Sequence, residues 1–366
     1  MFYSSKIRVG FAIALILNAS IAVPVEPGLL RRSAVVPVTS GSSVVFGSGT
    51  YPRANKLSDG TILGVNTVFH GGDNIIQTVL SNDSGQSWAY QGEVTRGTSN
   101  ANDIDNPYVL QLPSGRVLCA FRNHSKDPNS GAYTYFRITV AYSDDSGKSW
   151  SFLSQPAGDS GSVNGNWEPF LRNAQDGSLQ IYYSRENSKQ DQDTLERFSP
   201  DGGQTWTDPQ NISGTDITSR DGMTGVTAVD DKTLIAVFES ESDGTFTVDA
   251  INSSDDGKTW GNRRTIYTPD SPNTSAGAPQ VINIGGTLGV SFMTNEDQQL
   301  SSPSPGYTSN TASKFITSGD GGQTWGNKIN VGQVQSVWPG LCTLDDTKLL
   351  MTFDNNGAKA QKITLS

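Results

Sequence analysis

Two glutamates in this chain are placed where acid–base chemistry could occur. Glu168 directly precedes Pro169 at the start of one apolar segment, and Glu239 directly follows Phe238 at the end of another; the chain holds eight glutamates in all. Hydrolysis of a glycosidic bond needs one carboxyl group to protonate the leaving oxygen and a second to attack the sugar carbon or activate water, and their separation sets the stereochemistry. Either glutamate alone would suit a solvated strand end in an ion pair. Together they favour a hydrolytic pair, provided that the fold brings them to one place.

Other polar side chains could replace or assist this pair. Glu241 lies two residues beyond Glu239 and would be the reactive residue if the strand ended later. Asp354 follows a phenylalanine just as Glu239 does, and Asp105 lies beside Asn106 at the start of another apolar segment. Because their oxygens accept hydrogen bonds, we expect Asp354, Asp105 and Asn106 to bind sugar hydroxyls or to orient water.

Aromatic and basic residues at similar positions would complete a sugar-binding site. Aromatic rings can stack on a sugar or pack between neighbouring sheets, and four of them begin apolar segments: Tyr51, Trp167, Phe170 and Trp338. Trp338 is the clearest candidate for ligand contact, because it precedes Pro339 at a segment start with little left to pack against. Four arginines are expected to pair with the glutamates or to contact substrate: Arg53, Arg122, Arg185 and Arg220.

Other catalytic chemistries lack their usual residues in this sequence. His70 and His124 are the only histidines, Cys119 and Cys342 are the only cysteines, and no HExxH or CxxC spacing occurs. We therefore predict no metal, no cofactor and no Ser-His-Asp triad. His124 is predicted to be a loop residue, and the cysteines either form one bridge or are two buried thiols.

A short pattern repeated five times predicts the elements that position the candidates. Its copies are SNDSGQSW (Ser81–Trp88), SDDSGKSW (Ser143–Trp150), SPDGGQTW (Ser199–Trp206), SSDDGKTW (Ser253–Trp260) and SGDGGQTW (Ser318–Trp325). The aspartates recur at intervals of roughly 54 to 65 residues, which suits a four-stranded sheet with its loops. Asp accepts hydrogen bonds from a tight turn, Gly supplies positive φ, and Trp anchors the hairpin. We interpret the pattern as a structural turn and not as a catalytic site.

A second repeat, strand–turn–strand, gives the number of sheets. Its six copies are Tyr51–Gly64, Asn106–Phe121, Glu168–Tyr183, Gly222–Phe238, Ala278–Phe292 and Trp338–Phe353. Their Asp-Gly, Ser-Gly, Gly-Gly and Asp-Asp turns indicate β-hairpins. Only one further strand, Lys359–Leu365, follows the sixth copy, and Ser43–Gly47 would supply the missing outer strand. The sequence therefore predicts an all-β, six-bladed β-propeller with four-stranded antiparallel blades, closed by its N- and C-terminal strands.

This topology places both glutamates on one face. If each blade runs from the axis outward as strands A to D, the A–B and Asp-containing C–D turns lie at the bottom. The starts of A strands, the ends of B strands and the B–C loops then lie at the top, with Glu168 and Glu239 on adjacent blades. The predicted B–C loops are Arg122–Tyr135, Ser184–Thr194 and Met293–Lys314, and the last is the candidate wall of a pocket.

Composition and the N-terminus indicate the setting. A net charge of -10 and a pI near 4.7 argue against nucleic acid or an anionic membrane as partner. Lys6 and Arg8, an apolar run and small residues up to Ala22 predict a signal peptide over residues 1–22 and secretion. Residues 23–42 are then a short propeptide or N-terminal extension, and 43–366 a single catalytic domain, expected to be a monomer. Sequons that would suit an N-glycosylated protein lie at Asn82, Asn123, Asn211, Asn252 and Asn273.

The sequence resembles two nested families. The five-fold turn pattern resembles the Asp-box of the sialidase-like propeller superfamily, whose members include hydrolases, lectins and receptors. The runs YPRANKLSDGTILG, NPYVLQLPSGRVLCAFRNH, NWEPFLR and AVFESE resemble glycoside hydrolase family 93, the secreted exo-acting α-1,5-L-arabinanases of fungi. This resemblance implies a retaining mechanism on linear arabinan, with release of arabinobiose from the non-reducing end. It also implies that Glu168 is the acid/base and Glu239 the nucleophile.

Two alternatives remain open. A sialidase would need three arginines for the sialic acid carboxylate and a tyrosine nucleophile, and Arg53 in the run YPRA lies where such an enzyme has its first arginine. A non-catalytic carbohydrate-binding propeller would repeat its site in every blade. The strand starts differ instead, as Tyr51, Asn106, Glu168, Gly222, Ala278 and Trp338. The products formed from linear arabinan and from a sialyl substrate would distinguish the three.

Overall fold

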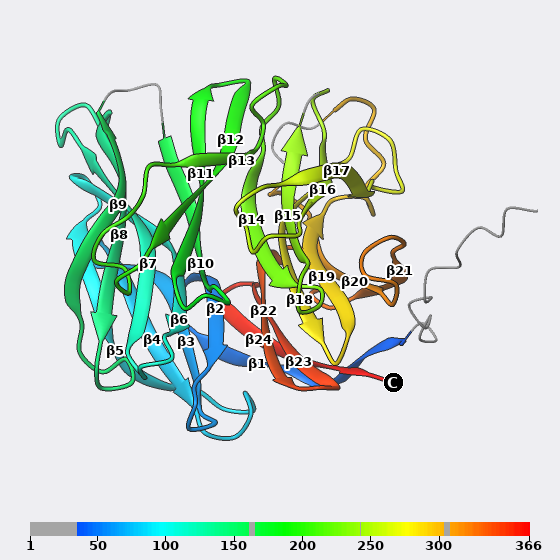
Figure 1. Cartoon of the computed structure of the whole chain (residues 1–366), viewed down its shortest axis with the longest axis horizontal. Coiled ribbons are helices and arrows are strands. Elements are labelled where there is room, and N and C mark those ends of the chain that lie inside the picture. The colour runs from blue at the N-terminus through cyan, green and yellow to red at the C-terminus, as the bar shows by residue number, and fades with distance from the viewer. Residues whose placement is uncertain (1–34, 161–164, 242, 304–307) are drawn as a thin grey trace, which may run out of the picture. The chain divides into compact units, whose positions relative to one another are not determined.

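Twenty-four strands form a ring of six four-stranded antiparallel sheets. The computed structural model describes residues 35–160, 165–241, 243–303 and 308–366, and these contain no helix. The innermost strands contact one another in cyclic order, β2, β6, β10, β14, β18, β22 and back to β2. The predicted six-bladed propeller is confirmed (Figure 1). The predicted signal peptide, and residues 23–34 of the predicted extension, lie outside the described residues.

Each blade is built from strands that follow one another in the chain. Blades one to three, from the axis outward, are β2 (Thr50–Lys56), β3 (Ile62–His70), β4 (Asp73–Ser81), β5 (Ala89–Thr98); β6 (Asn102–Gln111), β7 (Val117–Lys126), β8 (Tyr133–Ser143), β9 (Ser151–Ser160); and β10 (Gly165–Asn173), β11 (Leu179–Ser188), β12 (Asp191–Ser199), β13 (Gln210–Ser213). Blades four and five are β14 (Gly222–Ala228), β15 (Leu234–Glu241), β16 (Phe246–Ser253), β17 (Gly261–Tyr267); and β18 (Ala276–Ile284), β19 (Thr287–Thr294), β20 (Ala312–Ser318), β21 (Gly326–Asn330).

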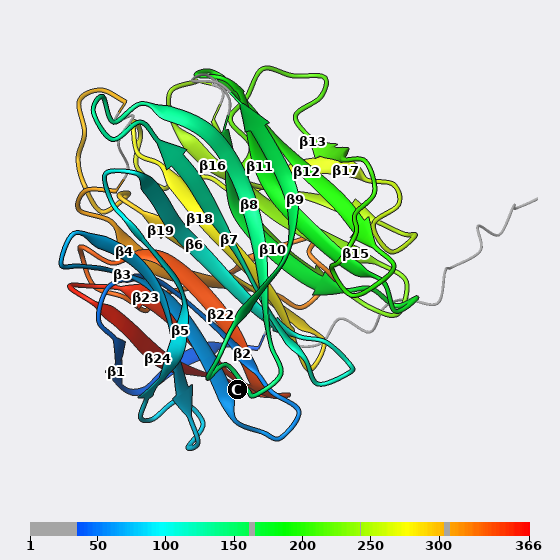
Figure 2. The same cartoon turned by 90° about the vertical axis from the view of Figure 1, so that its left-hand side faces the viewer.

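The sixth blade joins the two ends of the chain. It consists of β22 (Val337–Asp345), β23 (Lys348–Asp354), β24 (Ala358–Leu365) and, outermost, β1 (Pro37–Gly47). In Figure 1 the blue β1 lies with the red β23 and β24, and Figure 2 shows β1 beside β24 from the side. The closing strand begins at Pro37, earlier than the predicted Ser43. Part of the segment predicted as an extension is therefore part of the blade.

The repeated aspartate turn is held by hydrogen bonds to the aspartate side chain, as predicted. In blade two, Asp145 Oδ1 accepts bonds from Ser143 Oγ at 2.7 Å and from the Ser149 N–H at 2.9 Å. Gly147 has φ +86°, and a Cβ there would lie 2.8 Å from Leu63 of blade one. Only glycine therefore allows both the turn and the close contact with the neighbouring blade.

Adjacent blades are held by apolar cores and by polar contacts at the bottom face. Leu63 and Val65 of blade one pack with Val117 and Cys119 of blade two, for example. Cys119 and Cys342 are both buried free thiols. Of the two alternatives, one disulfide bridge or two buried thiols, the structure shows the second.

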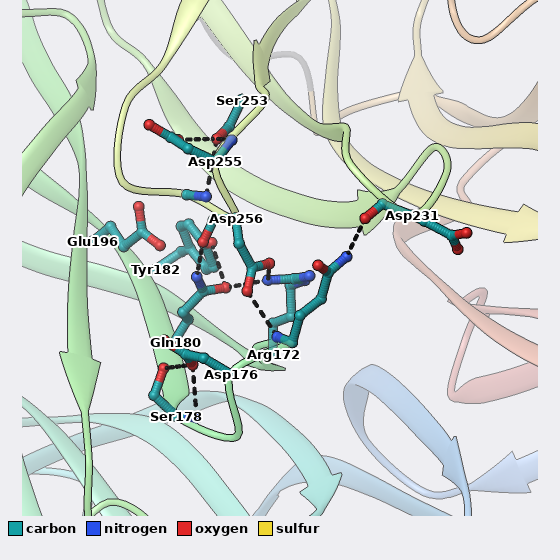
Figure 3. Close-up of polar contacts among 12 residues, drawn as sticks. Arg172, Asp176, Ser178, Gln180, Tyr182, Glu196, Asp231, Ser253, Asp255 and Asp256 are labelled. Carbon is teal, nitrogen blue, oxygen red and sulfur yellow. Dashed lines mark hydrogen bonds and ion pairs between the residues drawn. The ribbon is translucent and has the colours of Figure 1, made fainter.

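An ion pair between two side chains and a hydrogen bond from a side chain to the backbone connect blades three and four (Figure 3). Arg172 forms an ion pair with Asp256 at 2.7 Å and donates to Gln180 Oε1 at 2.6 Å. Gln180 in turn donates to the Asp256 carbonyl at 2.6 Å. Because Arg172 and Gln180 belong to blade three and Asp256 to an Asp-box of blade four, this network fixes the two blades that carry the glutamate pair.

Two of the three predicted B–C loops are mostly strand. β7 and β8 extend the second hairpin well into the segment Arg122–Tyr135, and β11 and β12 take up most of Ser184–Thr194. Between β19 and β20 the predicted long connection is present. His124, predicted to be a loop residue, lies in β7 and is fully buried.

Candidate active site

Every innermost strand carries a bulge near its start. At this point six residues that are not glycine adopt positive φ between 44° and 56°, and we call them the inner ring: Tyr51, Asn106, Glu168, Met223, Ala278 and Trp338. In each blade the strand register shifts at this position. Such strained conformations persist where the surrounding structure over-determines them, often at functional sites. In blade four the ring residue is Met223 and not Gly222, the strand start predicted from the sequence.

A second ring comes from the strands that pair with the bulged ones. The residue before each bulge pairs with one B-strand residue, and these form the second ring: Thr67, Arg122, Ser184, Glu239, Met293 and Asp354. The predicted equivalence of Asp354 and Glu239 is thus present in the strand register. Glu168 of the inner ring and Glu239 of the second ring lie at the same end of adjacent blades.

Some inner-ring N–H groups bond to the second ring of the preceding blade. Met223 donates to Ser184 Oγ at 3.1 Å, and Ala278 donates to Glu239 Oε2 at 2.7 Å. A carboxylate that accepts such a bond is stabilised in its charged form. The bulge that places Glu168 in the inner ring of blade three thus recurs in blade five, where it supplies an N–H donor to Glu239.

Glu168 is held in the protonated form at neutral pH. Burial, together with the nearby charge of Glu239, raises the pKa of its carboxyl to about 8. The Arg122 and Arg220 guanidinium groups and a hydrogen bond with Ser184 act in the opposite direction without overcoming it. A carboxylic acid that keeps its proton at pH 7 can act as a general acid.

Glu239 is positioned by a polar cluster behind its strand. Glu239 is 8% exposed, and it lies opposite Gly222 in the pairing of β14 with β15. Next to it, Arg263 donates to Ser240 Oγ at 2.8 Å and to Asp221 Oδ1 at 3.0 Å. Because Asp221 is fully buried and directly precedes Gly222, this ion pair fixes the strand ends around Glu239.

Glu241 is engaged elsewhere. Its Oε1 accepts a bond from the Gly244 N–H at 2.6 Å, and its backbone pairs with that of Arg220. The charge of Glu239, by contrast, acts on Glu168 and raises its pKa. Of the two alignments that the run ESE allows, the geometry favours Glu239.

Two aspartates and an arginine form the neighbouring wall in blade two. Arg122 Nη2 bonds Asp103 at 3.0 Å and Asp105 at 3.2 Å, and its guanidinium lies 5.2 Å from the Trp167 ring. Asp105 also accepts the Asn106 N–H at 2.7 Å. The predicted pairing of Arg122 with a glutamate is therefore replaced by pairing with aspartates, although Arg122 still acts on Glu168 from a distance.

Sequence reasoning missed part of this wall. Asp103 Oδ2 accepts a bond from the Tyr133 hydroxyl at 2.6 Å. Trp167 packs against His124 and Tyr133, with ring centroids at 4.7 Å and 6.2 Å. Burial lowers the pKa of His124 to about 4, so this histidine is uncharged at neutral pH and packs against the neighbouring rings. The pattern Asp-x-Asp at residues 103–105 was the available signal for the aspartate pair.

Tyr51 and Trp338 face each other across the junction of blades one and six. Their ring centroids are 6.1 Å apart, and the Arg53 guanidinium lies 4.0 Å from the Tyr51 ring. Arg53 is buried and donates to the Trp338 carbonyl at 2.9 Å. Trp338 thus has a packing partner after all, and it remains partly exposed.

Other predicted residues lie away from the pair or inside the core. Arg185 contacts Asp159 at 3.5 Å and is 38% exposed. Phe170 is 6% exposed and packs on Tyr108 at 4.4 Å, which makes it a core residue. Arg220, though near Glu168, forms its ion pair with Glu186 at 3.6 Å. Asp354 caps its own turn by accepting the Gly357 N–H at 3.0 Å.

In the described ranges, no three His, Cys, Asp or Glu side chains come together as metal ligands would. The same part of the chain holds no helix suited to crossing a bilayer.

The family model of BNR repeat-like domains matches residues 61–244. A curated sialidase of Paraclostridium sordellii is 24% identical over 244 residues, which are 60% of this chain. The chain spans 57% of the length of that relative.

Several solved structures share the fold. The family 93 α-L-arabinofuranosidase of Fusarium graminearum, solved with arabinobiose, is 21% identical with a TM-score of 0.70, over 88% of this chain and 98% of that one. An α-L-arabinanase of Penicillium chrysogenum, also with arabinobiose, is 19% identical with a TM-score of 0.70, over 90% and 99%. The NanB sialidase of Streptococcus pneumoniae is 12% identical with a TM-score of 0.54, over 89% and 69%. The resemblance to family 93 is confirmed at the level of the fold.

Proposed function

The chain belongs to the family of BNR repeat-like domains, and from the carboxyl pair of its two rings we propose that it is a retaining exo-α-1,5-L-arabinanase. One observation carries this proposal. Two glutamates on adjacent blades have opposite environments, since burial keeps Glu168 protonated while an N–H donor stabilises charge on Glu239. Pairs of titratable groups separated in this way are assigned as acid and nucleophile.

The reaction would proceed in two steps. First, a Glu239 carboxylate oxygen attacks the anomeric carbon, the bond to the leaving oxygen breaks, and Glu168 gives its proton to that oxygen. The Glu168 carboxylate then takes a proton from water, whose oxygen attacks the same carbon and displaces Glu239. Two inversions leave the released sugar with its original configuration.

Linear arabinan is the substrate that the structural neighbours favour. Two of them were solved with arabinobiose, and both superpose on this chain better than the sialidase does. The blade-five connection supports exo action, because it would close one side of the funnel, by which we mean the space around the axis at the face that carries Glu168 and Glu239. Its base is fixed by buried Glu296, which bonds Lys314 at 2.6 Å and Lys328 at 2.7 Å.

A sialidase is less well supported by the arginines and the tyrosine. Arg53, Arg122 and Arg185 are engaged with backbone carbonyls or aspartates, and Arg220 with Glu186. Burial raises the pKa of Tyr51, which opposes its use as a nucleophile. A lectin is also less well supported, because the six inner-ring residues differ from blade to blade.

Secretion is part of the proposal. It is supported by the charged and apolar N-terminal sequence and by the exposure of the sequon residue Asn82. A mass decrease after enzymatic deglycosylation and a mature N-terminus near residue 23 would test it.

The decisive experiment for the activity is a time course on linear arabinan beside a sialyl substrate. The proposal expects arabinobiose as the first product, with its anomeric configuration retained when followed by NMR. Longer oligomers from the outset would contradict exo action, inverted product would contradict the two-step mechanism, and release of sialic acid alone would favour the sialidase.

A further inference from the structure

A hollow lies on the same face as the glutamate pair, at the junction of blades six and one. It has a volume of about 520 Å³ and is lined by Gly49, Thr50, Phe69, Gln335, Val337, Asp354, Asn356 and Gly357. Thr50 and Val337 directly precede inner-ring residues, and Asp354 belongs to the second ring. The hollow therefore adjoins the funnel, directly beside Tyr51 and Trp338 in the chain.

Its position relative to the glutamates follows from the ring. In a ring of six blades, the junction of blades six and one lies opposite the junction of blades three and four. Glu168 and Glu239 come from blades three and four. A linear substrate bound at the pair and extended across the axis would reach this hollow.

The lining has the chemistry of a sugar site. Phe69 is 57% exposed, so the rim holds an aromatic ring with no core to fill. Asp354, Asn356 and Gln335 add one carboxylate and two amides, which can bond sugar hydroxyls. The floor depends on Gly49, whose φ is +89° and where a Cβ would lie 2.0 Å from the Thr67 carbonyl oxygen.

Beside the glutamate pair, the connection after β19 reaches the junction of blades four and five. In the connection after β19, Pro303 lies within reach of Gly244 beyond the end of β15, and the Leu300 carbonyl accepts a bond from Asn273 at 3.0 Å. Both contacts lie at the junction of blades four and five, on the Glu239 side. A polymer held by its end on that side would extend across the axis toward the hollow.

We propose that the hollow at Phe69 and Asp354 is a distal subsite that binds arabinofuranose units of the leaving part of the arabinan chain. The proposal rests on the proposed function, because it assigns the substrate that the glutamate pair would cleave. Phe69 would stack on a sugar face, and Asp354 would accept a hydroxyl hydrogen bond. The subsite would make longer chains better substrates than short ones.

The test compares arabino-oligosaccharides from the trimer to the hexamer. In the wild-type protein, kcat/KM is expected to rise with length until the chain reaches the hollow. Phe69→Ala should reduce that rise by about three- to tenfold, through KM and not through kcat. The matched control is Phe152→Ala, which removes an equally exposed ring, 68% exposed, from the outer strand β9. An identical length profile in Phe69→Ala and Phe152→Ala would overturn the subsite.

A binding measurement separates this inference from the proposed activity. In the Glu239→Gln background, arabinohexaose should bind more tightly than arabinobiose, and adding Phe69→Ala should remove most of the difference. A wild-type protein that cleaves no arabinan, but whose hexamer affinity still depends on Phe69, would overturn the activity and keep the subsite. Equal affinity for the hexamer and the dimer would overturn the subsite alone.

Discussion

The backbone N–H of Ala278 donates a 2.7 Å hydrogen bond to Oε2 of Glu239. Ala278 belongs to blade five, and its positive φ of 50° is part of the bulge that all six blades share. The blade that carries the candidate nucleophile thus depends on the next blade for its electrostatic support. The chemistry of the site is a property of the ring and not of one sheet.

Removal of each glutamate should have a different chemical outcome. Glu168→Ala is expected to lower kcat on arabinan by about 10²- to 10⁴-fold, with less loss on substrates whose leaving group needs no proton. With azide added, Glu168→Ala should form an arabinosyl azide of retained configuration, because Glu239 still forms the covalent intermediate. Glu239→Ala should form the inverted azide, because azide then attacks first. NMR of the products measures both, and Glu241→Ala is the control. The same configuration from both variants would contradict the assigned roles.

The basic limb of the pH profile, where kcat/KM falls at high pH, should follow the loss of the Glu168 proton. Activity needs its proton, so kcat/KM is expected to fall as pH rises through the pKa of about 8. The Ser184 hydrogen bond favours the charged form and lowers the pKa. Ser184→Ala should therefore move the limb to higher pH. A shift to lower pH would mean that another group controls it.

Glu168 should also make stability depend on pH. Its folded pKa of about 8 exceeds the ordinary 4.5, so the folded state binds a proton that the unfolded chain has lost between these values. Stability from this group is present below pH 4.5 and is lost as pH rises through 8. Glu168→Gln should raise the free energy of unfolding by about 1–3 kcal/mol more at pH 9 than at pH 4. Denaturant titrations at both pH values measure the difference, and an equal effect at both would contradict the protonation state.

An Asp-box variant should separate folding from catalysis. Asp145→Ala removes the acceptor for Ser143 Oγ and the Ser149 N–H, and should cost about 1–3 kcal/mol with kcat unchanged. Asp144→Ala is the neighbouring control, since it removes only a surface ion pair with Arg116 and should cost less stability than Asp145→Ala. Thermal unfolding and arabinan hydrolysis report the two quantities. A drop in kcat for Asp145→Ala at a temperature where it is folded would argue against a purely structural turn.

The blade count could be predicted because its determinants are local. Asp145 and Gly147 define one turn within a few residues, and four similar turns repeat it. The bulges had no comparable signal, since Glu168, Tyr51 and Trp338 adopt positive φ without being glycine. A proline follows the bulge in five blades but not after Met223, so blade four lacks the residue that marks this position in the other blades.

Long-range contacts explain the other differences. The polar stretch after Phe121 has the composition of a loop, yet it continues as a strand because His124 packs against Trp167 of the next blade. Arg122 was expected to pair with a glutamate or to contact substrate, and its ion pairs are with Asp103 and Asp105 on the paired strand. The placement of Glu168 and Glu239 on adjacent blades at one face followed from topology alone.

The pairing of Pro37 with Leu365 has a consequence for biosynthesis. The sixth sheet lacks its outermost strand until the C-terminal residues have left the ribosome and met a segment made at the very beginning. Chain closure of this kind has a high contact order and a correspondingly slow final step. Until β1 and β24 pair, the sixth blade has an open strand edge of the kind that can pair with other chains.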